Sequence, residues 1–98
     1  MYTIEFTDEA DRNLEGFSAR DRKVVIAAIE EQLKHDPTKR TKNRKPLREN
    51  PLADWELRVQ KYRVLYNVDA EIVTVLIVQW LSKTAIGSLL AEWSIHYD

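Results

Sequence analysis

The stretch from residue 55 to residue 66 constrains the fold more than any other part of the chain, because apolar side chains occupy alternate positions in it. Those apolar and aromatic positions are Trp55, Leu57, Val59, Tyr62, Val64 and Tyr66. Such alternation predicts two β-strands that each bury one face. The polar pair Gln60-Lys61 between the two runs favours a tight hairpin turn.

If these strands pair, Arg58 and Arg63 converge on the opposite, open face, with Glu56 nearby. Two guanidiniums held by a rigid sheet are well suited to binding and polarising a phosphodiester. This interpretation requires both arginines to face solvent together. An Arg63 guanidinium sequestered in the interior would contradict it.

Composition predicts one small domain that covers residues 1–98. A chain of 98 residues with 44% hydrophobic content is large enough for a single core. It has no cysteine, which removes disulfides and thiolate metal sites. The N-terminus lacks a signal-peptide pattern, and the longest apolar run, residues 72–78, suits a buried strand rather than a membrane span. We therefore expect a soluble cytoplasmic protein.

A run of basic residues leads into the hairpin. Residues 34–48 carry seven Lys or Arg and one acid, Asp36, so this segment has a net charge of +6 and the rest of the chain −7. A solvated loop is the simpler explanation of such a run. Because this run approaches a basic hairpin, we expect it to attract a nucleic acid. The expected contacts are Lys39, Arg40, Lys42, Arg44, Arg48, Lys61 and Lys83.

The remaining pattern predicts an α+β fold with the order strand, helix, helix, three strands, helix. The first strand holds Tyr2, Ile4 and Phe6, and two antiparallel helices cover residues 8–35. Thr7 and Ser18 are the expected N-caps, and Gly16 ends the first helix. The basic segment is expected to be irregular. Residues 71–80 are rich in β-branched side chains, which predicts a central strand buried on both faces. Ile86, Leu89, Leu90 and Trp93 have the spacing of an amphipathic C-terminal helix.

The chain resembles the RelE/ParE toxin superfamily over nearly its whole length. The resemblance rests on Trp-Glu-Leu-Arg-Val at 55–59, Tyr-Arg-Val-Leu-Tyr at 62–66, Lys-Pro-Leu-Arg at 45–48 and the two preceding helices. It implies a helical hairpin and a C-terminal helix packed on a small, mainly antiparallel, four-stranded sheet. It also implies a cognate antitoxin. Members of the RelE branch inhibit translation as mRNA interferases, by ribosome-dependent cleavage, whereas members of the ParE branch target DNA gyrase.

The resemblance also suggests roles for four residues. Arg63 matches the arginine that stabilises the transition state, and Arg58 and Lys45 would position the RNA backbone. Lys45 stands where some relatives place a glutamate proposed as the general base, so Glu56 is the substitute candidate. Alternatively, Glu56 simply pairs with Arg58 or Arg63.

The end of the last predicted strand departs from the family pattern. Ribonuclease relatives commonly carry an arginine or a His-Tyr pair there, whereas this chain has Gln-Trp-Leu-Ser-Lys at 79–83. A non-catalytic relative that binds RNA or its antitoxin, and acts as an autorepression partner, is therefore a third alternative. The resemblance further implies that the C-terminal stripe Ile86, Leu89, Leu90 and Trp93 contacts the antitoxin. We expect no metal site and no cofactor, because His35 and His96 are isolated.

Overall fold

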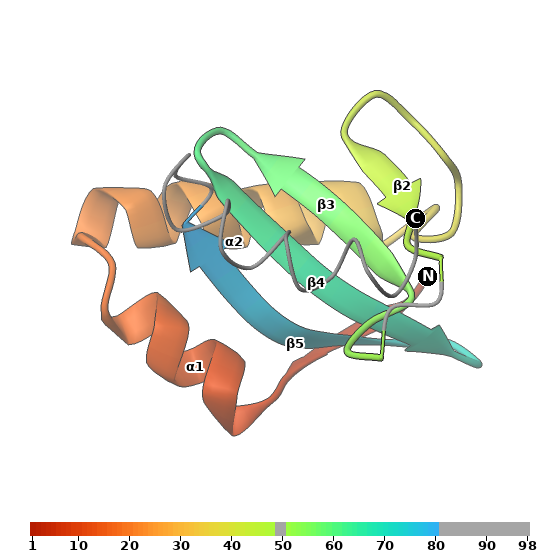
Figure 1. Cartoon of the computed structure of the whole chain (residues 1–98), viewed down its shortest axis with the longest axis horizontal. Coiled ribbons are helices and arrows are strands. Elements are labelled where there is room, and N and C mark those ends of the chain that lie inside the picture. The colour runs from red at the N-terminus through yellow and green to blue at the C-terminus, as the bar shows by residue number, and fades with distance from the viewer. Residues whose placement is uncertain (49–50, 81–98) are drawn as a thin grey trace.

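The computed structural model describes residues 1–48 and 51–80. In this part of the chain two helices cover one face of a five-stranded sheet with the strand order β1-β5-β4-β3-β2 (Figure 1). The elements are β1 (Thr3–Phe6), α1 (Asp8–Glu15), α2 (Ala19–Leu33), β2 (Arg44–Pro46), β3 (Trp55–Val59), β4 (Tyr62–Asp69) and β5 (Ile72–Trp80). Only the β1–β5 pair is parallel among the described strands, which confirms the prediction of a mainly antiparallel sheet. The predicted C-terminal helix lies outside the described residues.

Both helices begin at the predicted capping residues. The Thr7 hydroxyl accepts a hydrogen bond from the backbone amide of Ala10 at 3.1 Å, and the Ser18 hydroxyl accepts one from the amide of Asp21 at 3.1 Å. Each bond satisfies an amide that has no partner within its own helix. Gly16 ends α1, as predicted. Neither helix in the described ranges combines the length and the apolar character that a membrane crossing needs.

The β3–β4 hairpin has the predicted register and turn. Trp55 lies opposite Tyr66 and Val59 opposite Tyr62, so that Gln60 and Lys61 form the turn. The alternation sorts side chains between the two faces of the sheet as expected. On the helix side, the core is built by residues of α1, α2 and the strands, among them Leu14, Val25, Ile29, Leu33, Leu57, Val64, Tyr66, Val75 and Val78.

The basic segment contains a strand that the sequence did not predict. β2 pairs with β3 at the edge of the sheet, so the described sheet has five strands rather than four. Arg44, expected to be exposed, is 8% exposed, and its guanidinium donates hydrogen bonds to the carbonyl oxygens of Gln32 and Asp36. These carbonyls lie at the end of α2, where a cation is favourable. Arg44 is therefore a helix cap and not the exposed cation that the sequence predicted, and its contact with nucleic acid stays a prediction.

Burial on both faces occurs in β4 rather than in β5. Every residue from 62 to 66 in β4 is buried, whereas β5 buries Val73, Val75 and Val78 and leaves Ile72 39% exposed. β5 does lie inside the sheet, between β1 and β4. The β-branched composition therefore predicted a strand correctly, but the prediction that this strand is buried on both faces was wrong.

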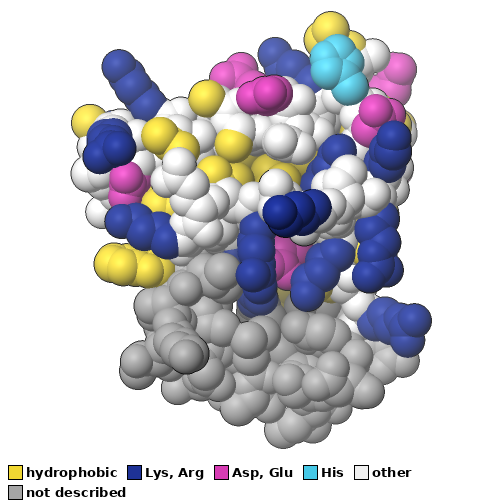
Figure 2. All heavy atoms as spheres, turned by 90° about the horizontal axis from the view of Figure 1, so that it is seen from above, with side chains coloured by type: hydrophobic (Ala, Val, Ile, Leu, Met, Phe, Trp, Pro, Cys, Tyr) yellow, Lys and Arg dark blue, Asp and Glu magenta, His cyan; other side chains and the backbone are white. Residues whose placement is uncertain are grey.

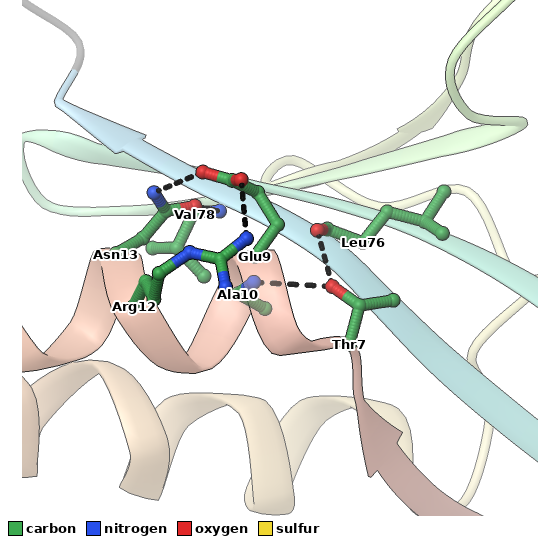
Figure 3. Close-up of polar contacts among 7 residues, drawn as sticks. All are labelled: Thr7, Glu9, Ala10, Arg12, Asn13, Leu76 and Val78. Atoms are coloured by element: carbon green, nitrogen blue, oxygen red, sulfur yellow. Dashed lines mark hydrogen bonds and ion pairs between the residues drawn. The ribbon is translucent and has the colours of Figure 1, made fainter.

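Side chains of α1 and the residue before it complete the hydrogen bonding along β5. The Thr7 hydroxyl donates to the carbonyl oxygen of Leu76 at 2.7 Å, and the amide of Val78 donates to the Asn13 carboxamide oxygen at 3.0 Å (Figure 3). β1 pairs with β5 only as far as Val75. Thr7 and Asn13 therefore replace a neighbouring strand beyond that point, which protects an edge that would otherwise be open.

A hydrogen-bonded latch fixes the tip of the hairpin to the start of α2. The Tyr62 hydroxyl donates to Asp21 Oδ2 at 2.6 Å, Lys61 Nζ lies 3.3 Å from the same oxygen, and the Phe17 ring stacks on Tyr62 at 4.2 Å. The hydrogen bond from Tyr62 lowers the pKa of Asp21 below its usual 3.8. Burial, followed by the bond to Asp21, raises the pKa of Tyr62 to about 12.

The substitution Ala70→Gly should stabilise the protein. Ala70 lies in the turn between β4 and β5 with a φ of 55°, a conformation that strains any residue with a Cβ. We expect the free energy of unfolding, measured by urea denaturation, to rise by about 0.5–1 kcal/mol. The same change at Ala27, exposed on α2, should lower it by about 1 kcal/mol. Destabilisation by Ala70→Gly would contradict this account of the turn.

The substitution Tyr62→Phe should change how stability depends on alkaline pH. The folded-state pKa of Tyr62 lies near 12, above the ordinary 10.0, so its hydroxyl stabilises the protein fully below pH 10 and loses this effect as the pH rises through 12. Urea titrations should show the stability of the wild type converging on that of Tyr62→Phe across this window. Tyr2→Phe on the chain before β1 serves as the control. A difference between wild type and Tyr62→Phe that stays constant from pH 10 to 12 would refute the latch.

Candidate functional site

A cationic hollow lies between β2 and β3, on the face of the sheet that points away from the helices. It encloses about 250 Å³ and is lined by Lys42, Asn43, Lys45, Glu56 and Arg58. In Figure 2, Lys and Arg side chains gather around an acidic side chain on the described surface. Lys45 and Glu56 lie directly opposite each other in the β2–β3 register, and the amide of Arg58 donates to the carbonyl of Asn43 at 2.8 Å. Backbone pairing therefore holds the lining in place.

Glu56 lines this hollow and is 1% exposed. Its Oε2 accepts a hydrogen bond from Arg63 Nε at 3.1 Å, and Arg58 Nε lies 3.6 Å from the same oxygen. Its Oε1 lies 3.9 Å from Lys45 Nζ and accepts no hydrogen bond from the described residues. Two guanidiniums and an ammonium thus compensate one buried carboxylate. The alternative that Glu56 pairs with Arg58 or Arg63 is correct for both arginines.

Arg63 does not face solvent, contrary to the prediction from the sequence. It lies opposite Arg58 in the hairpin and points to the same side of the sheet, as expected. However, its side chain is 3% exposed, whereas that of Arg58 is 51% exposed. β4 is an interior strand with both faces covered, and the alternation rule identifies the face but not what covers it. A ligand that approaches this face therefore meets Arg58 before Arg63. The prediction that both arginines face solvent is wrong, and a contact between Arg63 and a phosphodiester stays a prediction.

The other predicted cations have different environments. Lys45 is half-exposed at the hollow and Lys42 lines it, so both remain candidates for contact with a polyanion. Lys61 is at the hairpin tip, where it pairs with Asp21 and lies over the rings of Tyr62 and Trp80. Three further predicted cations, Lys39, Arg40 and Arg48, are exposed but do not line the hollow. The predicted contacts Lys83, Ile86, Leu89, Leu90 and Trp93 lie outside the described residues.

Asn43 is the member of the lining that the sequence analysis missed. It lies between Lys42 and Arg44 and just before β2, whose pairing with β3 brings it to the hollow. The only local signal was its place within the basic run. The residues of ranges 1–48 and 51–80 contain no cluster of three or more His, Asp or Glu side chains that could hold a metal ion. The hollow therefore offers electrostatic attraction and hydrogen bonding to an anionic ligand.

Solved structures similar to this chain identify its family. It is 30% identical to a chain in the toxin–antitoxin complex RelBE2 from Mycobacterium tuberculosis, with a TM-score of 0.70, over 81% of this chain and 96% of that one. The chain belongs to the RelE toxin family. The archaeal RelE–RelB complex from Pyrococcus horikoshii OT3 (17% identity, TM-score 0.68, coverage 84% and 97%) and the RelB–RelE complex from Methanococcus jannaschii (17%, 0.62, 87% and 96%) share the RelE fold. No family model and no curated protein sequence matches the chain.

The buried pair in this RelE-family protein should be strongly coupled. Arg63→Met leaves the Glu56 carboxylate without its closest partner and should lower the free energy of unfolding by about 3 kcal/mol. Glu56→Leu should lower the free energy of unfolding by a similar amount. The double variant should lower it by about 2 kcal/mol less than the sum of the two single effects. The exposed pair Glu9–Arg12 serves as the control, with an expected coupling of about 0.3 kcal/mol. Equally small coupling at both pairs would refute this assignment.

Proposed function

We propose that this chain is the toxin of a type II toxin–antitoxin pair and that it inhibits translation by cleaving messenger RNA at the ribosome. Membership of the RelE family supports the first part, because the 30% identical relative is described as part of a toxin–antitoxin complex. The cationic hollow supports the second part. A cognate antitoxin protein is the partner that this proposal requires.

The observation that carries the proposal is the pair of half-exposed cations on the two sides of Glu56. The side chains of Lys45 and Arg58 are 52% and 51% exposed, and each lies farther from the carboxylate than a normal hydrogen bond. Both can therefore turn towards a phosphate with little loss of contact to Glu56. Arg58 offers the planar guanidinium that binds phosphate through two hydrogen bonds, and Lys45 offers a point charge.

The cleavage reaction needs charge stabilisation at this position. In RNA cleavage of this type the 2′-hydroxyl gives its proton to a base and its oxygen attacks the phosphorus. The bond to the 5′-oxygen breaks, this oxygen leaves with a proton, and negative charge grows on the non-bridging oxygens in between. Cations held by a rigid sheet stabilise that charge. Because Arg63 is buried, this role passes in our proposal to Arg58 and Lys45, and Arg63 supports the site by holding Glu56. Glu56 as a catalytic residue stays a prediction.

Arg58→Ala should abolish the effect of the toxin on growth. We expect induced wild-type chain to arrest growth, stop incorporation of labelled amino acids and create new RNA 5′ ends inside translated codons. Arg58→Ala and Lys45→Ala should each slow the appearance of those ends about 100-fold. Lys23→Ala, which removes the same charge from an exposed position of α2, should behave as the wild type.

The same experiment separates the alternatives. Co-expression of the adjacent small open reading frame should restore growth if that frame encodes the antitoxin. Translation arrest without new 5′ ends would indicate that the chain binds RNA without cleaving it. The burial of Arg63 is the observation that favours this non-catalytic alternative. Growth arrest with a DNA damage response and continued translation would point to DNA gyrase as the target. A growth arrest that is as strong with Arg58→Ala as with the wild type would point to the same target. No arrest by the wild type would refute the toxin assignment.

A further inference from the structure

The cations around the hollow already have an anion among them, and the chain itself supplies it. Arg63 Nε lies 3.1 Å and Arg58 Nε 3.6 Å from Glu56 Oε2, and Lys45 Nζ lies 3.9 Å from Glu56 Oε1. A guanidinium binds a carboxylate and a phosphate through the same arrangement of donors. The Glu56 carboxylate therefore interacts with the same cations that a phosphate of the ligand would use.

The neighbouring strands keep this carboxylate in place. Glu56 lies in β3, opposite Lys45 of β2 on one side and opposite Leu65 of β4 on the other. It is 1% exposed, whereas the side chains of Lys45 and Arg58 are half-exposed. An exposed acid can turn into solvent when an anion approaches, but a carboxylate enclosed between two strands cannot withdraw in this way. Glu56 and the ligand must therefore share the same cations.

Repulsion between the carboxylate and a phosphate sets the size of the effect. A phosphate oxygen that accepts a hydrogen bond from Arg58 or Lys45 lies about 3 Å from that cation, and therefore within about 7 Å of the Glu56 carboxylate. At this separation, repulsion between two unit charges weakens binding about threefold in water and about fiftyfold at the effective dielectric constant near a protein surface. A phosphate that binds the two exposed cations is therefore opposed by Glu56.

We propose that Glu56 is a built-in competitor of the ligand, whose buried carboxylate keeps the affinity of the hollow for a phosphate chain about tenfold below what its cations alone would give. This inference rests on the proposed function, and it adds a residue that limits binding instead of promoting it. Weak binding of free RNA makes occupancy of the hollow depend on another surface, the ribosome in our proposal, which presents the strand at a high effective concentration.

The test measures how tightly the full-length chain binds a short single-stranded RNA in the absence of ribosomes, by fluorescence anisotropy. Glu56→Gln removes the charge and keeps the size of the side chain and an oxygen that can accept from Arg63. We expect it to bind the RNA about tenfold more tightly than the wild type. The salt dependence of binding should also become steeper, by about 0.7 in the logarithmic slope, because one more cation is available to the strand. Glu15→Gln, exposed at the end of α1, makes the same change in net charge and should leave both values unchanged.

The double variant Glu56→Leu/Arg63→Met covers the case in which Glu56→Gln fails to fold. It has the net charge of the wild type, and it removes the buried ion pair as a whole. Glu56 lines the hollow and Arg63 does not, so loss of the carboxylate should dominate and the affinity should rise about threefold.

Two results would overturn the inference. An affinity at or below that of the wild type, in folded Glu56→Gln or, failing that, in the double variant, would show that the carboxylate does not compete with the ligand. The proposed function would then stand, because RNA cleavage that depends on Arg58 is measured separately in cells. An RNA that binds neither the wild type nor the variants would overturn the RNA contact in the proposed function, and the inference with it.

Discussion

The register of the β3–β4 hairpin is the constraint on which the rest of the structure depends. Val59 lies opposite Tyr62, and this pairing sends the Tyr62 side chain towards α2 and the Arg63 side chain to the other face. A slip of one residue would exchange the two faces of a strand. The latch to Asp21 and the hydrogen bond to Glu56 would then both be lost. Contacts on opposite faces of the sheet thus stabilise the same register.

The buried carboxylate explains how several cations share a small volume. Arg63, Arg58 and Lys45 would repel one another without it, and Glu56 lies within 4 Å of all three. The three contacts are unequal. Arg63 is hydrogen-bonded and buried, whereas the two half-exposed cations stay beyond 3.5 Å. Because Arg63 is the hydrogen-bonded partner of Glu56, Arg58 and Lys45 would lose little direct bonding to the carboxylate if they turned towards another anion.

Local patterns predicted most of the fold. The alternation at 55–66 predicted the hairpin and its turn, and the capping residues Thr7 and Ser18 predicted where the helices begin. These features depend on neighbours close in sequence. β2 is three residues long and contains Pro46, so it has no periodic signal of its own. Its existence depends on β3, about ten residues further along the chain.

Burial of charged residues was the part of the site that local patterns did not predict. Arg44 is buried because the carbonyl oxygens that end α2 lie beside it, and Arg63 is buried because β4 is covered on both faces. Both facts depend on elements distant in sequence, and residue type alone favours exposure for arginine. The hairpin motif identified the family and brought Arg58, Arg63 and Glu56 together. It did not distinguish the arginine that meets solvent from the one that does not.

The parallel pairing of β1 with β5 determines when the sheet can be completed during folding. Thr3 lies beside Ile72 and Phe6 beside Val75, so the two ends of the described chain meet in one ladder. Contacts between such distant segments form slowly, after local hairpins and helices. The meander of β3, β4 and β5 has no such delay, because its strands follow one another directly. During synthesis, a chain that leaves the ribosome N-terminus first therefore holds its earliest strand unpaired until its last described strand has emerged.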